Sequence, residues 1–496
     1  MKVQAILVGM MLAATTTATA GGILTNTNQS IDFLRNPARD AAIGLDGVYS
    51  NPAGVAFLSE GFHFGFNWQY AHQTRTIEST SPFFALGKKN NGATTKTFEG
   101  VADAPCIPSI QAAYNTGNWS WQFNFSVPGG GGKCEFADGL GSFESVVGNI
   151  ANQLKPLGAQ GYDMDGYMQG RQYYFGFQLG TAYKVMDNLS VYGGLRLLWG
   201  TATYRARISN IMVNTAGGYV DFSSFLQTGT ATVDGGLSQV NAGIAQLEAV
   251  PGATLLPQYD ELVAKKAQLE NTRQSLNALQ KYSEGVNLLC NQSSVGIAPV
   301  IGADYKAGRF NFAAKYEFKT QIRMKNESTV FEASEIAAVN KFRDSEEVNE
   351  DAPAQLALGA QWAPIDQVRV NVGWHHFFDK DAEWYNNAQD LLDHDSNEYL
   401  AGVEWDINDR LTISGGMQLT RYGLSDQYMN DMSFVVNSYS LGLGFNYKAN
   451  DKLVLKAGYF QTNYDHYKRE NYPAEGFSDD FTRTNRVLGV GCEINL

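Results

Sequence analysis

The sequence predicts an all-β transmembrane protein: an antiparallel β-barrel of about 14 strands, with an N-terminal plug in its lumen and a helical extracellular insertion. Three observations predict this fold. After residue 60, strand-like segments alternate apolar and polar residues with a period of two. The gaps between them are alternately short and long, as in barrels with tight turns on one rim and large loops on the other. The composition combines 51 glycines and 12% aromatic residues with only 18% charged residues.

Residues 1–20 have the features of an export signal. Lys2 is the only charge, residues 6–14 are mostly apolar, and Ala18-Thr19-Ala20 is a cleavage motif. The alternative is an anchoring helix, but the apolar run is too short to span a bilayer. We expect the mature chain to begin near Gly21.

Residues 21–61 are predicted to form the plug. They are polar, do not alternate cleanly, and contain two Asn-Pro-Ala triplets, of which the second is Asn51, Pro52 and Ala53. A disordered leader is the alternative. The plug is favoured because the strand positions opposite the apolar face are often glycine, whereas a water-filled porin has polar and charged side chains there. Glycine that merely provides barrel curvature is the competing explanation. The glycines are Gly176, Gly180, Gly194, Gly359, Gly373, Gly402, Gly416, Gly442, Gly444, Gly458, Gly489 and Gly491.

Residues 62–496 are predicted to form the barrel. The first strand shows the pattern: Phe62, Phe64, Phe66, Trp68 and Tyr70 alternate with polar residues and a glycine. Six short connections, most of them rich in Asn, Asp and Gly, suit tight hairpin turns. Fourteen strands require six turns on that rim.

The long loops are predicted on the opposite rim. The third differs in composition, since it is rich in Ala, Gln, Leu and Lys, with Leu262, Leu269 and Leu276 at heptad spacing and a break at Pro251-Gly252. It predicts two helices that form an extracellular cap at about 235–290. A partner-binding coiled coil is the alternative. The predicted loops are 75–105, 128–171, 215–294, 326–351, 379–397, 423–434 and 465–483.

The four cysteines allow a disulfide in an exported protein. Cys492 has lipid-facing parity near the periplasmic rim and is expected to be a free thiol. The other three, Cys106, Cys134 and Cys290, lie toward the outer side. Connectivity cannot be derived from sequence, and we expect the pair Cys134–Cys290.

Several charges have inward-facing parity. Glu317 is expected to pair with one of the lysines, because buried charges are rarely left unpaired. Unpaired cations among the rest can hold the carboxylate of an amphipathic ligand. The candidate ligand-binding residues are Arg196, Lys315, Lys319, Arg369 and Lys456.

Other chemistry is not supported. A net charge of −13 argues against nucleic-acid binding. The glycine run 128–133 lacks the spacing of a phosphate loop. His375 and His376 point to opposite faces of a strand, which disfavours joint metal ligation. No motif supports a serine–histidine pair. We expect no catalytic residue, no metal and no cofactor, and therefore not an enzyme.

Several stretches resemble the FadL/TodX family of outer-membrane transporters for long-chain fatty acids and other hydrophobic compounds. The segment from Gly44 through Asn51-Pro52-Ala53-Gly54 resembles the family's plug motif, and 175–189 resembles its central hairpin. Residues 352–359 and 372–378 resemble two later strands. The resemblance implies a fourteen-stranded barrel with a small plug, and transport without ATP. It also implies lateral opening at a kink in the third strand, here at Pro128, Gly129 and Gly130.

The expectation is therefore a multi-pass protein of the bacterial outer membrane that transports hydrophobic small molecules passively. Long-chain fatty acids are ranked above aromatic hydrocarbons. A lipid-modifying barrel enzyme and an adhesive surface protein are alternatives from other classes. The expected partners are outer-membrane lipids, lipopolysaccharide and a hydrophobic substrate, without nucleic acid, and the default state is a monomer.

Overall fold

A computed structural model describes residues 29–332 and 337–496. The predicted export signal at 1–20 and the first plug residues, 21–28, lie outside this range.

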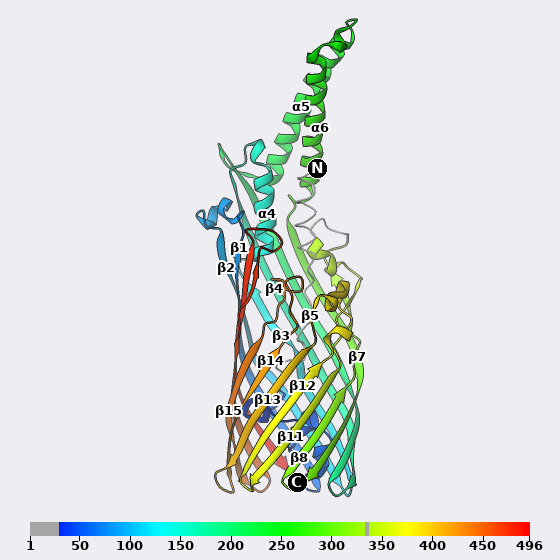
Figure 1. The fold of residues 1–496 in the computed structure, drawn as a ribbon, viewed down its shortest axis with the longest axis vertical. Coiled ribbons are helices and arrows are strands. Elements are labelled where there is room, and N and C mark those ends of the chain that lie inside the picture. Colours follow the sequence, from blue (N-terminus) through cyan, green and yellow to red (C-terminus); the bar gives the residue numbers. More distant parts are fainter. Residues whose placement is uncertain (1–28, 333–336) are drawn as a thin grey trace.

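Fourteen long antiparallel strands form a closed barrel (Figure 1). Each strand pairs with its neighbours in chain order, and β18 pairs with β1 to close the ring. The predicted number of strands is confirmed. The barrel strands are β1 (Gly61–Thr80), β2 (Thr95–Thr116), β3 (Trp119–Phe136), β4 (Gly161–Met186), β5 (Leu189–Thr215), β7 (Val286–Ala307), β8 (Phe310–Glu317), β11 (Gln355–Ile365), β12 (Val368–Phe377), β13 (Ser396–Asp406), β14 (Leu411–Arg421), β15 (Ser438–Asn450), β16 (Leu453–Tyr464) and β18 (Ser478–Asn495).

Four short strands extend the sheet on the loop side of the barrel. They are β6 (Gly218–Asp221), β9 (Arg323–Ser328), β10 (Glu347–Asn349) and β17 (Tyr467–Glu470). The six predicted short turns are present at the opposite end, where the C-terminus also lies (Figure 1). Gly117 and Gly308 supply the positive φ, 56° and 61°, that these tight turns require.

The side chains of the lower barrel follow the predicted alternation. Phe62, Phe66 and Trp68 are exposed on the outer surface, whereas His63 and Asn67 are buried toward the lumen. A band of exposed aromatic and aliphatic side chains on a closed barrel is stable only against lipid. The strands therefore span a membrane.

The strands on one side of the barrel are longer than the sequence predicted. β1 to β5 and β7 have 18 to 27 residues each, so the wall continues well above the lipid-facing band. Much of the first two predicted loops, and both ends of the third, are strand instead. Above the membrane the outer face meets water and no longer needs apolar residues, so the alternation that marks a strand fades there.

The three longest helices lie on the loop side. α4 (Gly141–Gln153) packs beside the outer ends of β4 and β5. α5 (Phe222–Glu248) and α6 (Pro257–Gln280) form an antiparallel hairpin that projects away from the barrel (Figure 1). It begins about 13 residues earlier than predicted. Within the described residues, no helix combines the length and apolarity needed to cross a membrane. The largest hydrophobic core lies in this outer part, between the upper wall, α4 and the loops. Short 3-10 helices occur at Phe84–Leu86, Lys88–Asn90, Lys155–Leu157, Ala253–Leu255, Ala337–Phe342, Asp379–Asp381 and Tyr385–Leu391.

The predicted disulfide is wrong, because all four cysteines are free thiols. Cys134 in β3 lies opposite Gly170 in β4, Gly170 lies opposite Tyr204 in β5, and Tyr204 lies opposite Cys290 in β7. Three strand spacings separate the two cysteines by about 14 Å. A disulfide requires Cα atoms within about 7 Å.

We therefore expect four reactive thiols per chain. Thiol titration of protein that has been unfolded without reductant measures this number directly. A count of two would contradict the arrangement of β3 and β7.

Candidate functional site

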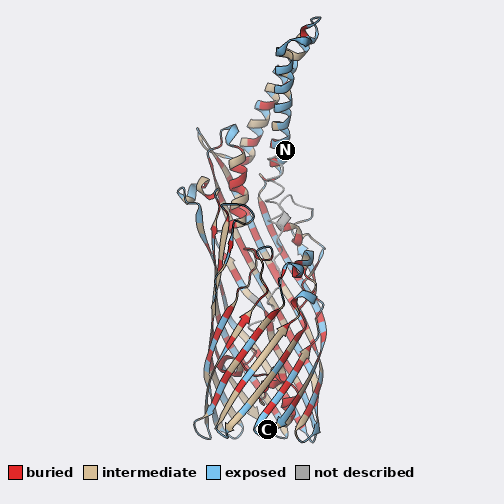
Figure 2. Ribbon diagram, viewed as in Figure 1, coloured by how far each residue is buried: buried red, intermediate tan, exposed pale blue. Residues whose placement is uncertain are grey.

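The N-terminal segment from residue 29 to residue 60 lies inside the barrel near its short-turn end, where it is almost entirely buried (Figure 2). It contains α2 (Ile31–Arg35), α3 (Gly47–Ser50) and the 3-10 helix η1 (Gly54–Phe57). Ser30 caps α2 by accepting a hydrogen bond from the backbone N–H of Phe33 at 3.2 Å. We refer to residues 29–60 as the plug segment.

Many of the inward-facing glycines lie directly against the plug segment. A Cβ added at Gly359 would lie 2.6 Å from the Cβ of Asp40, and one at Gly444 would lie 2.8 Å from the Cβ of Arg35. Added Cβ atoms at Gly373, Gly402, Gly416, Gly442, Gly458, Gly489 and Gly491 would likewise come close to plug-segment atoms. The glycine-rich inner wall thus provides space for this segment. Gly176, Gly180 and Gly194 lie instead against Pro128 and Tyr192.

The second Asn-Pro-Ala triplet fastens the segment to three strands, β3, β5 and β7. The Asn51 side chain donates to the Asp304 carboxylate at 2.6 Å and accepts from the N–H of Gly54 at 3.2 Å. The carbonyl of Pro52 accepts from Gln122 at 2.7 Å, and that of Ala53 accepts from Ser190 at 2.6 Å. Backbone carbonyls that no helix or sheet satisfies here obtain their partners from the barrel wall.

A buried ion network holds the other end. Glu404 in β13 lies 2.7 Å from Arg35 and 3.0 Å from Arg39 of the plug segment, and 3.2 Å from Arg369 of β12. Lys456 in β16 lies 2.5 Å from Asp32 and 2.7 Å from Glu493. Removing one member of such a buried network leaves an uncompensated charge, which costs about 3–5 kcal/mol.

The predicted ligand-binding cations all have protein partners. Arg369 and Lys456 belong to the network above. Arg196 pairs with Glu317 at 2.5 Å, so the expected lysine partner of Glu317 is wrong. Lys315 donates to the carbonyl of Tyr49 at 3.1 Å, and Lys319 lies 3.6 Å from Asp351. Their role in ligand binding stays a prediction, and their contacts favour a structural role.

His375 is a plug contact that sequence reasoning did not find. Its ring nitrogens lie 2.8 Å from Asp40 of the plug segment and 2.8 Å from Glu398 of β13. The neighbouring His376 faces the other side and contacts Asn397, as expected. No group of three or more potential metal ligands is close enough to hold an ion in the described part of the chain.

The β2–β3 ladder is interrupted. The two strands pair from Thr116↔Trp119 to Ile110↔Phe125, and again only from Ala102↔Cys134 onward. The intervening residues are 103–109 and 126–133, which include the predicted kink positions Pro128, Gly129 and Gly130. They lie within β3 and not in a loop. Pro128 has no N–H to donate, and Gly130 has a φ of 102°. The wall therefore has a gap in its hydrogen bonding at this point.

The first described residue of the plug segment contacts both sides of this gap. The Gln29 carbonyl accepts from Ser109 of β2, and the Gln29 side chain donates to the carbonyl of Val127 of β3 at 3.4 Å. A displacement of the plug segment would therefore break contacts with both strands that border the gap.

Above the gap is a cavity of about 70 Å³ with a mixed lining, which is enough for several water molecules. Its polar residues include Arg75, Arg171 and Glu350, and it reaches the upper end of the gap at Gly132 and Cys134. Its apolar residues are Phe136, Met168 and Met432, together with the ring of Tyr204.

Arg75 of β1 lies directly opposite Arg483 of β18. Neither guanidinium forms an ion pair with any residue that the structure describes, and the buried Nε atoms of both have no hydrogen-bond partner there. The terminal nitrogens of Arg483 donate to neutral groups only, the carbonyl of Phe434 and the side chain of Gln73, each at 3.3 Å. Two adjacent arginines without a carboxylate are costly to bury, and an anion beside them would remove that cost. Glu350, the acidic residue of the cavity, is already paired with Lys341.

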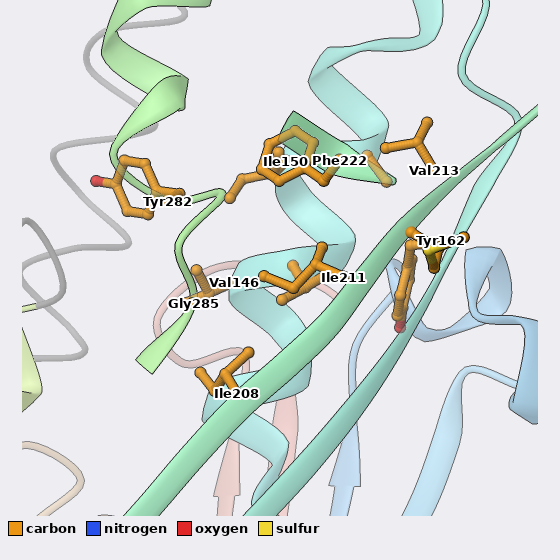
Figure 3. Close-up of a pocket in the computed structure, with 12 residues that line it drawn as sticks. Val146, Ile150, Tyr162, Ile208, Ile211, Val213, Phe222, Tyr282 and Gly285 are labelled. Atoms are coloured by element: carbon orange, nitrogen blue, oxygen red, sulfur yellow. The ribbon is translucent and has the colours of Figure 1, made fainter. Parts of the chain in front are cut away.

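A second cavity lies at the outer end and is almost purely apolar (Figure 3). Val146 and Ile150 of α4 face Ile208 and Ile211 of β5, and Phe222 and Tyr282 from the two bases of the hairpin complete the lining. The free volume is about 10 Å³, room for about one water. An apolar ligand would enter only as these side chains move apart.

The sequence matches no protein-family model and no curated relative. Solved structures are similar over nearly the whole chain. A Pseudomonas aeruginosa FadL homologue aligns with a TM-score of 0.60 at 11% identity, covering 95% of this chain and 99% of the homologue. The P. putida toluene transporter TodX aligns with a TM-score of 0.54 at 12% identity, covering 97% and 98%.

The chain has the fold of these two barrels. At such low identity the similarity concerns the fold alone, so the function has to be argued from this chain's own residues.

Proposed function

We propose that this protein is a passive, multi-pass transporter of the bacterial outer membrane for hydrophobic small molecules. The observation that carries the proposal is the interrupted β2–β3 ladder beside a lumen filled at its lower end by the plug segment. A solute that enters from outside meets the plug below it and a gap in the wall at its side. A hydrophobic solute can leave through such a gap because its transfer into lipid is favourable, whereas the transfer of a polar solute into lipid is not.

The route has three steps. The apolar cavity at the base of α5 and α6 captures the solute by burial of apolar surface, worth about 25 cal/mol per Å². The solute then enters the cavity beside Arg75. It leaves between β2 and β3 when the contacts of Gln29 to Ser109 and Val127 break. No step requires ATP or covalent chemistry, so we propose no enzymatic activity.

Long-chain fatty acids are the proposed substrates, ahead of aromatic hydrocarbons. Arg75 and Arg483 favour a ligand with an anionic head, since arginine stays charged and matches the geometry of a carboxylate. Phe136, Met168 and Met432 line the same cavity as Arg75 and suit the start of an acyl chain. TodX is described as a toluene transporter, and an aromatic hydrocarbon would leave both guanidinium groups without an anionic partner. Lipopolysaccharide and outer-membrane lipids surround the barrel, and a monomer suffices because one chain closes it.

Uptake of labelled oleate into proteoliposomes tests the proposal. We expect the protein to accelerate uptake, and equal uptake with and without the protein would refute transport. Gly129 is buried at the gap, so Gly129→Trp is expected to reduce uptake to near the protein-free background. Gly193→Trp is the matched control, because a side chain at Gly193 meets no atom within 4 Å. Unchanged uptake by Gly129→Trp would exclude the lateral route.

A further inference from the structure

The hairpin of α5 and α6 is built as a stiff arm. Along α5, Gly229, Gly236 and Gly243 recur every seven residues, and an added Cβ on each would contact Leu276, Leu269 and Leu262 of α6, respectively, at 3.2–3.5 Å. Leucines that fill positions left by glycines let two helices approach closely. Arg273 also pairs with Asp234 at 3.0 Å across the hairpin. The 27 residues of α5 extend about 40 Å.

The tip of this arm is apolar and exposed. Leu255 is 88% exposed, which is more than any lipid-facing leucine of the barrel, such as Leu179 at 64%. Val250 and Leu256 beside it are also exposed, as is Val263 on the first turns of α6. The turn itself needs only Gly252, with a φ of 79°, and Pro257 at the start of α6. No residue that the structure describes covers these aliphatic side chains.

The arm holds its tip away from the protein's own membrane. Figure 1 shows the hairpin leaving the loop side of the barrel and pointing away from the short-turn end. The lipid-facing side chains, such as Phe62, Phe66 and Trp68, lie toward that short-turn end. At about 40 Å from its base, the tip cannot reach the bilayer that surrounds the barrel. Any apolar surface that the tip contacts therefore lies beyond this bilayer, on the loop side of the barrel.

The charge near the tip selects the kind of surface. Residues 249–259 contain no charged side chain, and the nearest charges on either side, Glu248, Asp260 and Glu261, are all acidic. Acidic residues disfavour approach to an anionic surface. Tryptophan and arginine, which are among the residues that dominate protein–protein hot spots, are also missing from residues 249–259, and the one aromatic residue there, Tyr259, donates to Glu248 at 2.9 Å.

We propose that the tip of the α5–α6 hairpin docks on an uncharged lipid or oil surface outside the cell. Val250, Leu255 and Leu256 insert into that surface, and the arm then spans the roughly 40 Å between it and the outer apolar cavity, whose lining includes Phe222 and Tyr282. This inference rests on the proposed function, because docking would supply the proposed transporter with substrate from an apolar phase. Docking can nevertheless be measured without any transport.

The full-length protein in lipid nanodiscs is mixed with triolein droplets coated with phosphatidylcholine, and the floated fraction is measured. We expect wild-type protein to float with the droplets, and Leu255→Asn/Leu256→Asn to bind about tenfold more weakly. Phe331→Asn is the matched control, because Phe331 is 77% exposed in another outer loop. It is expected to float like wild type. Droplets coated with anionic phosphatidylglycerol should bind wild-type protein more weakly than the neutral droplets do.

Equal flotation of the double variant and wild type would overturn the proposal. So would wild-type nanodiscs that pair tip to tip without droplets, since a second copy would then be the occupant. Both residues lie in an exposed turn, and an unchanged circular dichroism spectrum checks that the hairpin is intact. Loss of flotation with normal uptake of dissolved oleate would support docking, and the reverse would support transport alone.

Discussion

Replacing Gly416 with leucine is expected to push the plug segment out of place and to open an ion-conducting pore through the barrel. Gly416 faces the lumen, where an added Cβ would lie 2.8 Å from Pro37 and 3.0 Å from the Asn36 side chain. A leucine cannot fit there without displacing either strand β14 or the plug segment. Around Gly416 the wall is held by unbroken backbone pairing of β14 with β13 and β15, whereas the plug segment contacts it mainly through side chains, so the plug segment should yield.

The consequence should be large. A fourteen-stranded barrel without its plug leaves a lumen wide enough for water and ions. Single-channel recording in planar bilayers should show little conductance for wild type and frequent large openings for Gly416→Leu. Gly415→Leu is the control, since Gly415 is the adjacent residue on the outer face and its added Cβ meets only a carbonyl at 3.5 Å.

The predicted displacement would be contradicted if Gly416→Leu showed no more conductance than wild type and its plug segment were as protected from protease as in wild type. Overpacking costs about 1–3 kcal/mol and sometimes more, so folding must be checked by heat-modifiable migration on gels. Gly402→Ala serves as a milder second variant. An added Cβ there already contacts Asn36, and we expect briefer openings of the same kind.

The membrane-spanning part of the fold could be predicted from sequence because lipid imposes a strict local rule. Every second residue of each strand must be apolar there, as at Phe62, Phe66 and Trp68. The same parity identified the glycines that face the plug segment, such as Gly402 and Gly444. The first three loops were predicted too long, because Thr74, Thr76 and Glu78 continue β1 where lipid no longer constrains the outer face.

The site was harder to predict because its contacts join distant parts of the chain. Parity placed Arg369 and Lys456 inside the barrel, but nothing local indicated that Glu404, Asp406 and Asp32 would neutralise them. The predicted disulfide between Cys134 and Cys290 was wrong for the same reason, since spacing in sequence does not give the number of strands that lie between two residues. Arg75 and Arg483 were missed because both lay in segments predicted as loops. A strand prediction that extended past the lipid-facing band would have placed both inside the barrel.

Removing the two arginines that lack a carboxylate partner is expected to abolish discrimination in favour of anionic ligands. The double variant Arg75→Gln/Arg483→Gln should bind oleate about 10- to 100-fold more weakly, because a hydrogen bond to a charged group is worth about 1.5–3 kcal/mol. Oleyl alcohol has the same chain without the charge, and its affinity should change little. Arg205→Gln is the control, since Arg205 is exposed on the barrel surface.

Binding of both ligands to purified protein by calorimetry distinguishes the possible outcomes. A selective loss for oleate assigns the two guanidinium groups to the carboxylate. An equal loss for oleate and oleyl alcohol would mean that the arginines only shape the cavity. No loss for either would place the head group elsewhere and would return Arg196, Lys315 and Lys319 as candidates. The first outcome is expected because, among the described residues, Arg75 and Arg483 lie side by side with no carboxylate bound to either.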